Sequence, residues 1–144
     1  MEVITGTIIL KDNKIMMVKE SKKECFGKWS FPAGHLQDNE TIFEGAKRET
    51  LEETGCKVEL KKTFPILKMK NKDFNIIMIL FLADLLEETD EFDKDEIQET
   101  KWFSMDEIKN MKKEDVRCYE MVENVLETLD KNIFYDLEIF KEIM

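Results

Sequence analysis

The sequence predicts a single domain of the α/β or α+β class, in which helices pack against a mixed sheet. The chain has 144 residues, which is the length of one domain with a substantial buried core. Hydrophobic residues make up 42% of the chain and charged residues 38%, with only two prolines and five glycines, so the composition is that of a globular protein. Apolar β-branched runs are interspersed with segments of helical period, and this order of elements is typical of a layered α/β sandwich.

The first third of the chain is predicted to be mostly strand. Residues 3–10 (VITGTIIL) and 14–20 (KIMMVKE) are apolar runs separated by a short polar segment, which predicts a hairpin. Residues 21–28 (SKKECFGK) read as a polar loop. Residues 29–34 (WSFPAG) then predict a short strand that enters a Pro/Gly turn.

A helix is predicted from Thr41 to Gly55. Thr41 and Glu44 have the spacing of a capping box, in which each side chain binds the other residue's backbone N–H. Gly55 lies where a helix commonly ends, because glycine readily adopts the left-handed conformation.

Two further strands are predicted after this helix, over residues 57–70 and 74–85. The second is apolar on both faces and is therefore expected to be central in the sheet. Residues 87–99 form a charged loop in this prediction, followed by a short strand at 100–103.

The C-terminal part is predicted to be helical. Ser104 and Glu107 form a second capping box that begins a short helix. A longer helix is predicted over residues 114–129, and the last dozen residues are expected to add a helical turn or two. The apolar stripe of the longer helix consists of Val116, Tyr119, Val122, Val125, Leu126 and Leu129.

The net charge of −10 limits the classes of partner. Thirty-two acidic residues against 22 basic ones give a surface that repels phosphate backbones, so binding to a nucleic acid duplex through a basic patch is not expected. If the partner is anionic, a divalent metal ion is the obvious mediator.

The cysteines and the hydropathy indicate a cytoplasmic protein without a membrane partner. Cys25, Cys56 and Cys118 are far apart and odd in number, which argues against a disulfide framework or a zinc site and fits a reducing compartment. No apolar run reaches 18 residues, and the N-terminus lacks the pattern of a signal peptide.

The segment RETLEETG, residues 48–55, concentrates carboxylates on one part of the predicted helix. On a helical wheel Glu49 and Glu53 lie beside Ile42, at the margin of the face expected to pack on the sheet. Glu52 lies slightly further round. Like charges at this spacing repel each other, and the cost is greater at the margin of a buried face.

These carboxylates have two possible interpretations. An isolated E-x-x-E-E segment is most simply a solvated helix edge that is balanced by Arg48 and nearby lysines. The position beside the packing face favours instead a site for a hard cation such as Mg²⁺ or Mn²⁺, which takes carboxylate oxygens and bridges to substrate phosphate. In that interpretation Arg48 pairs with a neighbouring carboxylate and fixes its orientation.

The residues before this segment complete a longer motif. From Gly34 the sequence reads G-x5-E-x7-R-E-x-x-E-E-x-G, with Glu40 at the first glutamate position and Gly55 at the end. This resembles the Nudix box, G-x5-E-x7-R-E-U-x-E-E-x-G-U, where U is a bulky aliphatic residue. The two U positions differ, because they hold Thr50 and Cys56, and both are expected to be packing positions. The resemblance implies one Nudix hydrolase domain over residues 1–144, folded as an α/β/α sandwich whose box forms a loop-helix-loop.

The resemblance also implies an activity and roles for residues. The activity is metal-dependent hydrolysis, by Mg²⁺ or Mn²⁺, of a nucleoside diphosphate linked to another group. Glu49, Glu52 and Glu53 take the metal-ligand positions, to which the backbone carbonyl of Ala33 adds a further candidate. Arg48 takes the position that orients Glu49, and Glu40 supports it, while Gly34 allows the turn.

The general base is left open by the resemblance, because Nudix proteins use either a box glutamate or a glutamate from a later loop. Glu49 and Glu52 are the candidates within the box. Glu99 and Glu96 are the loop candidates, and for either of these a solvated loop position is the alternative.

His35, Arg117 and Phe74 are the candidate substrate-binding residues. His35 is expected to contact a phosphate or else to be structural, Arg117 to reach the substrate from the late helix, and Phe74 to stack on a base or else to be core. The marker proline of ADP-ribose pyrophosphatases is missing, since its neighbourhood reads Lys70-Asn71-Lys72.

The substrate is predicted to be a small nucleotide or pyrophosphate. PAGHLQDNET and RCYE (residues 117–120) are similar to a small bacterial branch that acts on nucleoside di- and triphosphates and on hydroxymethylpyrimidine pyrophosphate. The alternative is a non-catalytic Nudix-fold sensor that holds a nucleotide without cleaving it. The presence of Arg48 and all three box glutamates favours the enzyme. The oligomeric state is left open, with a homodimer as one possibility.

Overall fold

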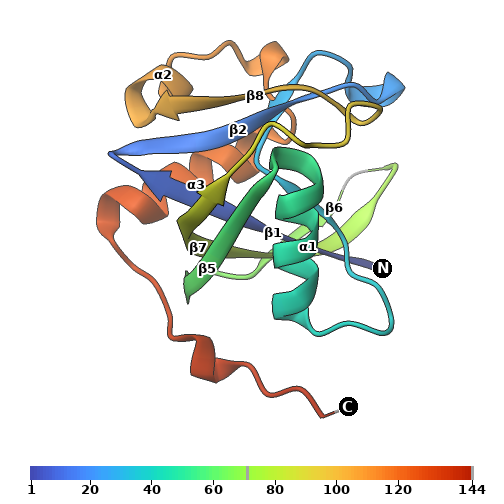
Figure 1. Ribbon diagram of the computed structural model, residues 1–144, viewed down its shortest axis with the longest axis vertical. Coiled ribbons are helices and arrows are strands. Elements are labelled where there is room, and N and C mark those ends of the chain that lie inside the picture. The colour runs from blue at the N-terminus through green and yellow to red at the C-terminus, as the bar shows by residue number, and fades with distance from the viewer. Residues whose placement is uncertain (71, 144) are drawn as a thin grey trace.

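The computed structural model describes residues 1–70 and 72–143. Asn71, in the segment that lacks the marker proline, therefore lies outside the described residues. The elements of the structure follow the predicted order (Figure 1). They are β1 (Glu2–Lys11), β2 (Lys14–Glu20), β3 (Trp29–Ser30), β4 (Ala33–His35), α1 (Ile42–Thr54), β5 (Cys56–Thr63), β6 (Leu67–Lys70), β7 (Asn75–Glu88), β8 (Ile97–Ser104), α2 (Met105–Lys109) and α3 (Tyr119–Lys131), with short 3-10 helices at Lys23–Cys25, Lys113–Asp115 and Leu137–Ile139.

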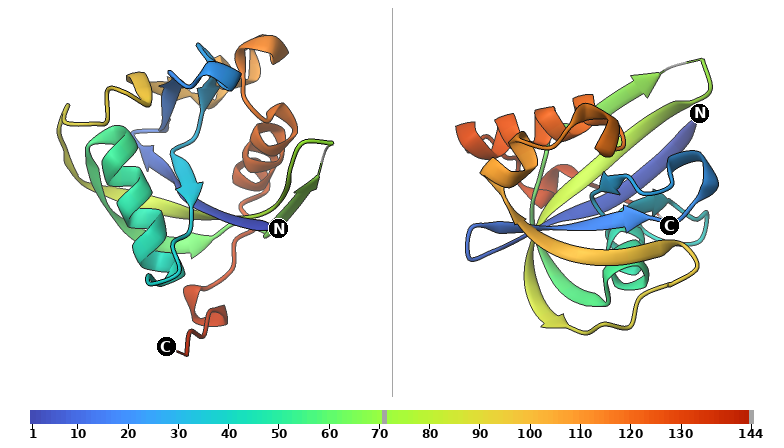
Figure 2. Two further views of the ribbon diagram at one scale, coloured as in Figure 1. Left: turned by 90° about the vertical axis from the view of Figure 1, so that its right-hand side faces the viewer. Right: turned by 90° about the horizontal axis from the view of Figure 1, so that it is seen from above.

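The strands form a mixed sheet with β7 at its centre, as predicted. β7 pairs parallel with β1 and antiparallel with β5 and β6, while β4 pairs antiparallel with β1. β2 pairs antiparallel with β3 and β8. β1 and β2 pair with each other only next to their turn, at Leu10 with Ile15 and Lys11 with Lys14, and then diverge (Figure 2).

The hairpin between β1 and β2 is confirmed, and its two turn residues explain how tight it is. Asp12 and Asn13 have φ angles of 51° and 62°. Positive φ at both central residues is the requirement of a type I′ turn, and Asn and Asp tolerate this conformation better than most residues.

Helices cover both faces of the sheet, which confirms the α/β/α sandwich. α1 lies on one face and α3 on the other (Figures 1 and 2). Adjacent residues of β1 show the division, since Ile8 belongs to the core cluster that includes α3, whereas Ile9 belongs to the cluster that includes Ala46 of α1. Alternation of side chains along a strand requires this arrangement.

Three predicted boundaries were wrong. The single strand over residues 57–70 is two strands, β5 and β6, interrupted around Pro65, which has no backbone N–H for a sheet ladder. The strand predicted at 100–103 begins earlier, at Ile97, so the charged loop is shorter than predicted. The helix predicted over 114–129 begins only at Tyr119.

The late start of α3 has a physical cause. Val116 pairs with Trp29 in an isolated bridge, and Arg117 N–H donates to the Trp29 carbonyl at 2.9 Å. Cys118 then adopts a left-handed conformation, with φ 53°, which prevents the helix from extending backwards. Arg117 therefore lies in a turn before α3, and its backbone is held to β3.

The last residues return to the beginning of α1. Tyr135 pairs with Thr63 of β5, and the ring of Phe140 packs 5.5 Å from that of Phe43. Glu142 Oε1 accepts a hydrogen bond of 2.8 Å from the backbone N–H of Ile42, the first residue of α1. The predicted helical turn in this segment is the short 3-10 helix Leu137–Ile139.

Cys25, Cys56 and Cys118 are free thiols. Each helix in the described part of the chain is too short or too polar to cross a lipid bilayer.

Candidate active site

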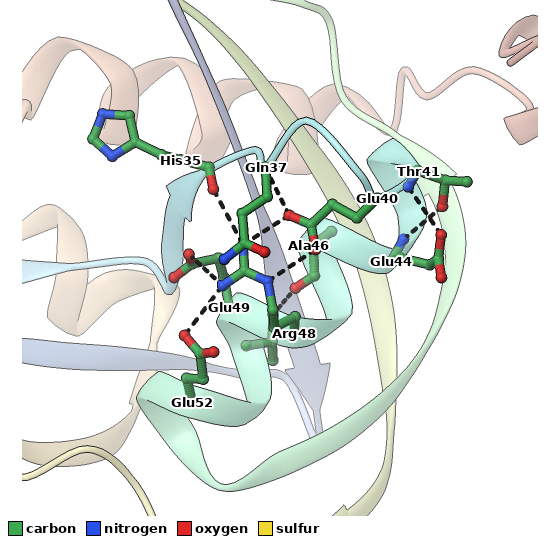
Figure 3. Close-up of polar contacts among 10 residues, drawn as sticks. His35, Gln37, Glu40, Thr41, Glu44, Ala46, Arg48, Glu49 and Glu52 are labelled. Atoms are coloured by element: carbon green, nitrogen blue, oxygen red, sulfur yellow. Dashed lines mark hydrogen bonds and ion pairs between the residues drawn. The ribbon is translucent and has the colours of Figure 1, made fainter. Parts of the chain in front are cut away.

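The helix α1 carries the box, and its ends are fixed by local contacts. Thr41 Oγ1 accepts from Glu44 N–H at 3.0 Å, while Glu44 Oε1 accepts from Thr41 N–H at 2.9 Å (Figure 3). Gly55 ends the helix with φ 72° and donates its N–H to Leu51. The predicted helix, with both of its caps, is therefore confirmed.

The two positions that differ from the motif are buried, as expected. Cys56 packs in the core cluster on the α1 face. Thr50 is fully buried, and its hydroxyl donates to the Ala46 carbonyl at 2.7 Å. The hydroxyl of Thr7 on β1 lies 2.6 Å from that of Thr50, so a hydrogen bond joins the helix to the sheet here.

Arg48 is the centre of a network of carboxylates (Figure 3). Its Nε and Nη2 donate to the two oxygens of Glu40, at 2.9 and 2.8 Å. Its Nη1 donates to Glu49 at 2.9 Å and to Glu52 at 3.2 Å, and Nη2 also reaches the His35 carbonyl at 3.1 Å. The bidentate pair lowers the pKa of Glu40 and raises that of Arg48. The Arg48 guanidinium thus connects the segment before α1, through Glu40 and the His35 carbonyl, to two carboxylates on α1.

Glu49 lies against the backbone of Gly34. The Glu49 side chain is 12% exposed, and burial raises the pKa of its carboxyl group, against the opposing effect of Arg48. A Cβ atom at position 34 would lie 2.2 Å from the carboxyl carbon of Glu49. Only glycine leaves room for the carboxylate in this position.

Glu53 is almost completely buried, with 2% exposure. Its Oε1 accepts a hydrogen bond from the Ala33 N–H at 3.1 Å. Burial, followed by the negative charges of Glu20 and then Glu49, raises its pKa to about 8, although the Ala33 hydrogen bond opposes this shift. At this site the backbone N–H of Ala33 binds Glu53. That the Ala33 carbonyl is a metal ligand stays a prediction.

The donor set fits a divalent cation in charge and chemistry. Within residues 1–70 and 72–143, no three acidic, histidine or cysteine side chains are grouped closely enough to hold a metal as they stand. Glu49 and Glu52 are paired with Arg48, and Glu53 is buried near other carboxylates, a position that disfavours its ionised form. A hard cation would offset this repulsion, and carboxylates are the ligands that Mg²⁺ and Mn²⁺ prefer.

A cavity of about 170 Å³ adjoins Ala33 and Gly34. The three residues predicted to bind substrate, His35, Phe74 and Arg117, all line it. His35 is exposed, and its Nε2 lies 3.0 Å from Glu2 Oε2. A larger cavity of about 290 Å³ lies between α2 and α3 and contains no box residue among those that line it.

The structure separates the two loop candidates for the general base. Glu99 lies within β8, paired with Lys19, and its side chain is exposed, so the prediction that it lies in a loop was wrong. β8 begins earlier than predicted and includes this residue. Glu96 precedes the strand, pairs with Lys22 at 3.8 Å, and lies close enough to Glu49 to raise its pKa.

Sequence reasoning missed Glu20 and Lys22, which also line the cavity. Glu20 is 2% exposed and lies close to both Glu53 and Arg117. Its only sequence signal is that it ends a strand whose middle residues are apolar, which by itself does not distinguish a buried glutamate from a solvated one.

Comparisons with known proteins agree with this geometry. The family model of the NUDIX domain matches residues 2–124. The 8-oxo-dGDP phosphatase NUDT18 of Danio rerio is 31% identical over 100 residues, which are 66% of this chain and 30% of that protein. An ADP-ribose pyrophosphatase of Methanocaldococcus jannaschii is 32% identical over 81 residues, 55% of this chain and 48% of that protein.

Among solved structures, a NUDIX hydrolase from Nitrosomonas europaea has a TM-score of 0.89 at 25% identity, covering 99% of this chain and 97% of that one. The chain belongs to the Nudix family. It spans less than a third of the length of the NUDT18 relatives that it matches.

Proposed function

We propose that this chain is a metal-dependent pyrophosphohydrolase whose substrate is a nucleoside di- or triphosphate. The observation that carries the proposal is the Arg48 network, which holds Glu49 and Glu52 on the same helix as the buried Glu53. Glu53 and Glu49 lie against Ala33 and Gly34, which line the cavity. A structural acidic edge would not require a glycine at position 34 to make room for a carboxylate.

Each box residue has a distinct role in this proposal. Glu49, Glu52 and Glu53 hold Mg²⁺ or Mn²⁺, and Arg48, braced by Glu40, keeps Glu49 in place. The cation, when bound, neutralises the diphosphate and lowers the pKa of a coordinated water. Glu49 or Glu96 accepts the proton of the attacking water. Of the two candidates outside the box, Glu96 is preferred over Glu99 because of its position near Glu49.

The size of the cavity favours a substrate with one ring system to bury. An apolar cavity of about 150 Å³ holds one benzene-sized ring, and this cavity is of similar size, about 170 Å³. The names of two relatives, an 8-oxo-dGDP phosphatase and an ADP-ribose pyrophosphatase, define the compounds to test first.

The decisive experiment is a substrate panel with Mg²⁺ or Mn²⁺, in which released phosphate and pyrophosphate are measured separately. The panel contains nucleoside di- and triphosphates, 8-oxo-dGDP, ADP-ribose, a dinucleoside polyphosphate and hydroxymethylpyrimidine pyrophosphate. Metal-dependent release from the mononucleotides, absent in Glu53→Gln, is the expected result. Tight binding of a nucleotide without release from any compound would contradict catalysis and support the sensor.

The same assay distinguishes the two candidate bases outside the box, Glu96 and Glu99. Glu96→Gln is expected to lower kcat by about a hundredfold if Glu96 is the base, a loss typical for removal of a general base. Glu99→Gln is the matched control and is expected to retain wild-type turnover. A large loss in Glu99→Gln alone would reverse the assignment.

A further inference from the structure

Glu20 is a buried carboxylate that the box does not include. The pairing of β2 with β8 shifts register between Lys19 and Glu20, so that the end of β2 departs from regular alternation. Its backbone is fixed on both sides: Glu20 N–H donates to the Lys28 carbonyl at 2.9 Å, and its carbonyl accepts from Gly27 N–H and from Gln98 Nε2, both at 2.8 Å. The position of this carboxylate is therefore determined by the fold.

The carboxylate of Glu20 forms an ion pair with Arg117. Glu20 Oε1 lies 3.3 Å from Arg117 Nη1, and Oε2 accepts from the Cys25 thiol at 3.7 Å. Only 3% of the Glu20 side chain is exposed, whereas 38% of the Arg117 side chain is. Because a buried charge without a partner is costly, the buried Glu20 carboxylate favours the position of Arg117 in which the two are paired. The pair holds one edge of the guanidinium in place, and the rest of the guanidinium stays accessible.

Arg117 is also held through its backbone. Its N–H donates to the Trp29 carbonyl, and the next residue, Cys118, is in the left-handed conformation. The guanidinium lines the same cavity as Ala33 and Gly34, next to the box. A guanidinium has five N–H groups and no acceptor, so any ligand group that binds it must offer an oxygen or nitrogen lone pair.

The rest of the cavity is largely apolar. Ile4, Phe31, Ile76, Met78, Leu80 and Met121 line it. In apolar surroundings a hydrogen bond between ligand and protein contributes strongly to the binding free energy. A donor that faces another donor instead weakens binding, because both groups lose water without gaining a partner. A substrate ring that enters this cavity therefore meets a fixed, donor-only group at its wall.

We propose that Arg117, positioned by Glu20, is a specificity-determining residue that donates a hydrogen bond to an oxo group on the base of the substrate. The inference rests on the proposed function, which brings a nucleotide to this cavity. A purine with oxygen at its 6-position presents a lone pair to the guanidinium, whereas a 6-amino group presents N–H donors. Glu20 acts through Arg117 and is a positioning residue.

Inosine and adenosine diphosphate test this, because their purine rings differ at the 6-position and in the protonation of the adjacent ring nitrogen. The wild-type protein is expected to prefer inosine diphosphate in kcat/KM by about tenfold to a hundredfold, the range for one hydrogen bond from a charged donor. Arg117→Gln and Glu20→Gln are each expected to bring this ratio close to one, mainly by raising KM for inosine diphosphate. The double variant is expected to lower the ratio no further than Arg117→Gln does, since Glu20 acts through Arg117.

Lys109→Gln is the matched control. It removes an ion pair of similar length, 3.0 Å to Asp130, in the other cavity, and is expected to leave the ratio unchanged. Thermal denaturation verifies that each variant is folded. If Glu20→Gln does not fold, Arg117→Lys decides, because lysine keeps the charge but loses the planar fork and is expected to lose most of the discrimination.

A wild-type ratio within about threefold of one, or a ratio retained in Arg117→Gln, would overturn the proposal. Metal-dependent turnover of both nucleotides in that case would leave the proposed function standing. Absence of turnover of every nucleotide in the wild type would refute the proposed function instead, and calorimetric titration with the same two nucleotides would then measure the discrimination directly.

Discussion

Replacement of Glu53 by glutamine separates the two effects of this carboxylate, because it should remove activity and yet stabilise the metal-free protein. The side chain is 2% exposed, and its pKa is raised from 4.5 to about 8 in the folded state. The folded protein therefore binds more protons than the unfolded chain between these pH values. Stability from this group is greatest below pH 4.5 and is lost as the pH rises toward 8.

The magnitude follows from the pKa shift. Between pH 4.5 and 7 the loss accumulates over about 2.5 pH units at 1.36 kcal/mol each, so it is on the order of 3 kcal/mol at pH 7. Glutamine is neutral, has the same shape, and can accept the hydrogen bond from the Ala33 N–H. Glu53→Gln should therefore be more stable than the wild type at pH 7 in a chelator, by up to this amount, and the two should converge near pH 4.5.

Urea denaturation in EDTA at pH 5, 6, 7 and 8 measures this difference. Addition of Mg²⁺ should raise the stability of the wild type at pH 8 much more than that of the variant, because bound cation favours the ionised carboxylate. Turnover should be lost in the variant at every pH. A variant that is less stable than the wild type at pH 8 in EDTA, or one that retains near wild-type turnover, would refute this reasoning.

Three further substitutions test other parts of the structure. Gly34→Ala places a methyl group against the Glu49 carboxylate and is expected to reduce turnover about a hundredfold, since small displacements of catalytic groups have effects of this size, with little change in melting temperature; an active variant would show that the close approach is unimportant. Arg48→Lys loses the bidentate contact with Glu40 and should lower kcat by roughly tenfold or more and stability by about 1–2 kcal/mol, measured by steady-state kinetics and urea denaturation. Phe140→Ala removes two ring contacts at 5.4 and 5.5 Å and should cost about 2 kcal/mol in the same denaturation assay; an unchanged midpoint would mean that the C-terminal segment does not stabilise the fold.

The parts of the fold that depend on local contacts were predictable from the sequence. Thr41 and Gly55 fix the ends of α1 through hydrogen bonds to residues within four positions, so their spacing is sufficient to place the helix. The hairpin turn at Asp12 and Asn13 is local in the same sense. The carboxylates of the box were therefore placed on the correct helix and at the correct margin.

The parts that depend on distant strands were not predictable. Glu20 is buried because β8, almost 80 residues later, pairs with the end of β2 and shifts register there. The apolar period continues through Val116 and so predicts that Arg117 is helical, but the bridge from Val116 to Trp29 holds Val116 extended and leaves Arg117 in a turn before α3. Helical propensity is a weak signal when a sheet edge offers hydrogen bonds instead. Both errors concern the wall of the cavity, which is built from separate parts of the chain.

The hydroxyl pair between Thr7 and Thr50 has a consequence for substitution at the aliphatic position of the motif. Thr50 holds that position, and its hydroxyl is bonded both to its own helix and to Thr7 on the sheet, in a fully buried place. A leucine at position 50 alone would leave the Thr7 hydroxyl without this bond and would add volume where no space is free. Thr7→Val combined with Thr50→Val keeps the shape and removes both hydroxyls together. Replacement of one threonine alone is therefore expected to give a less stable protein than either the two threonines or the two valines, so a design that follows the family pattern at position 50 has to change Thr7 as well.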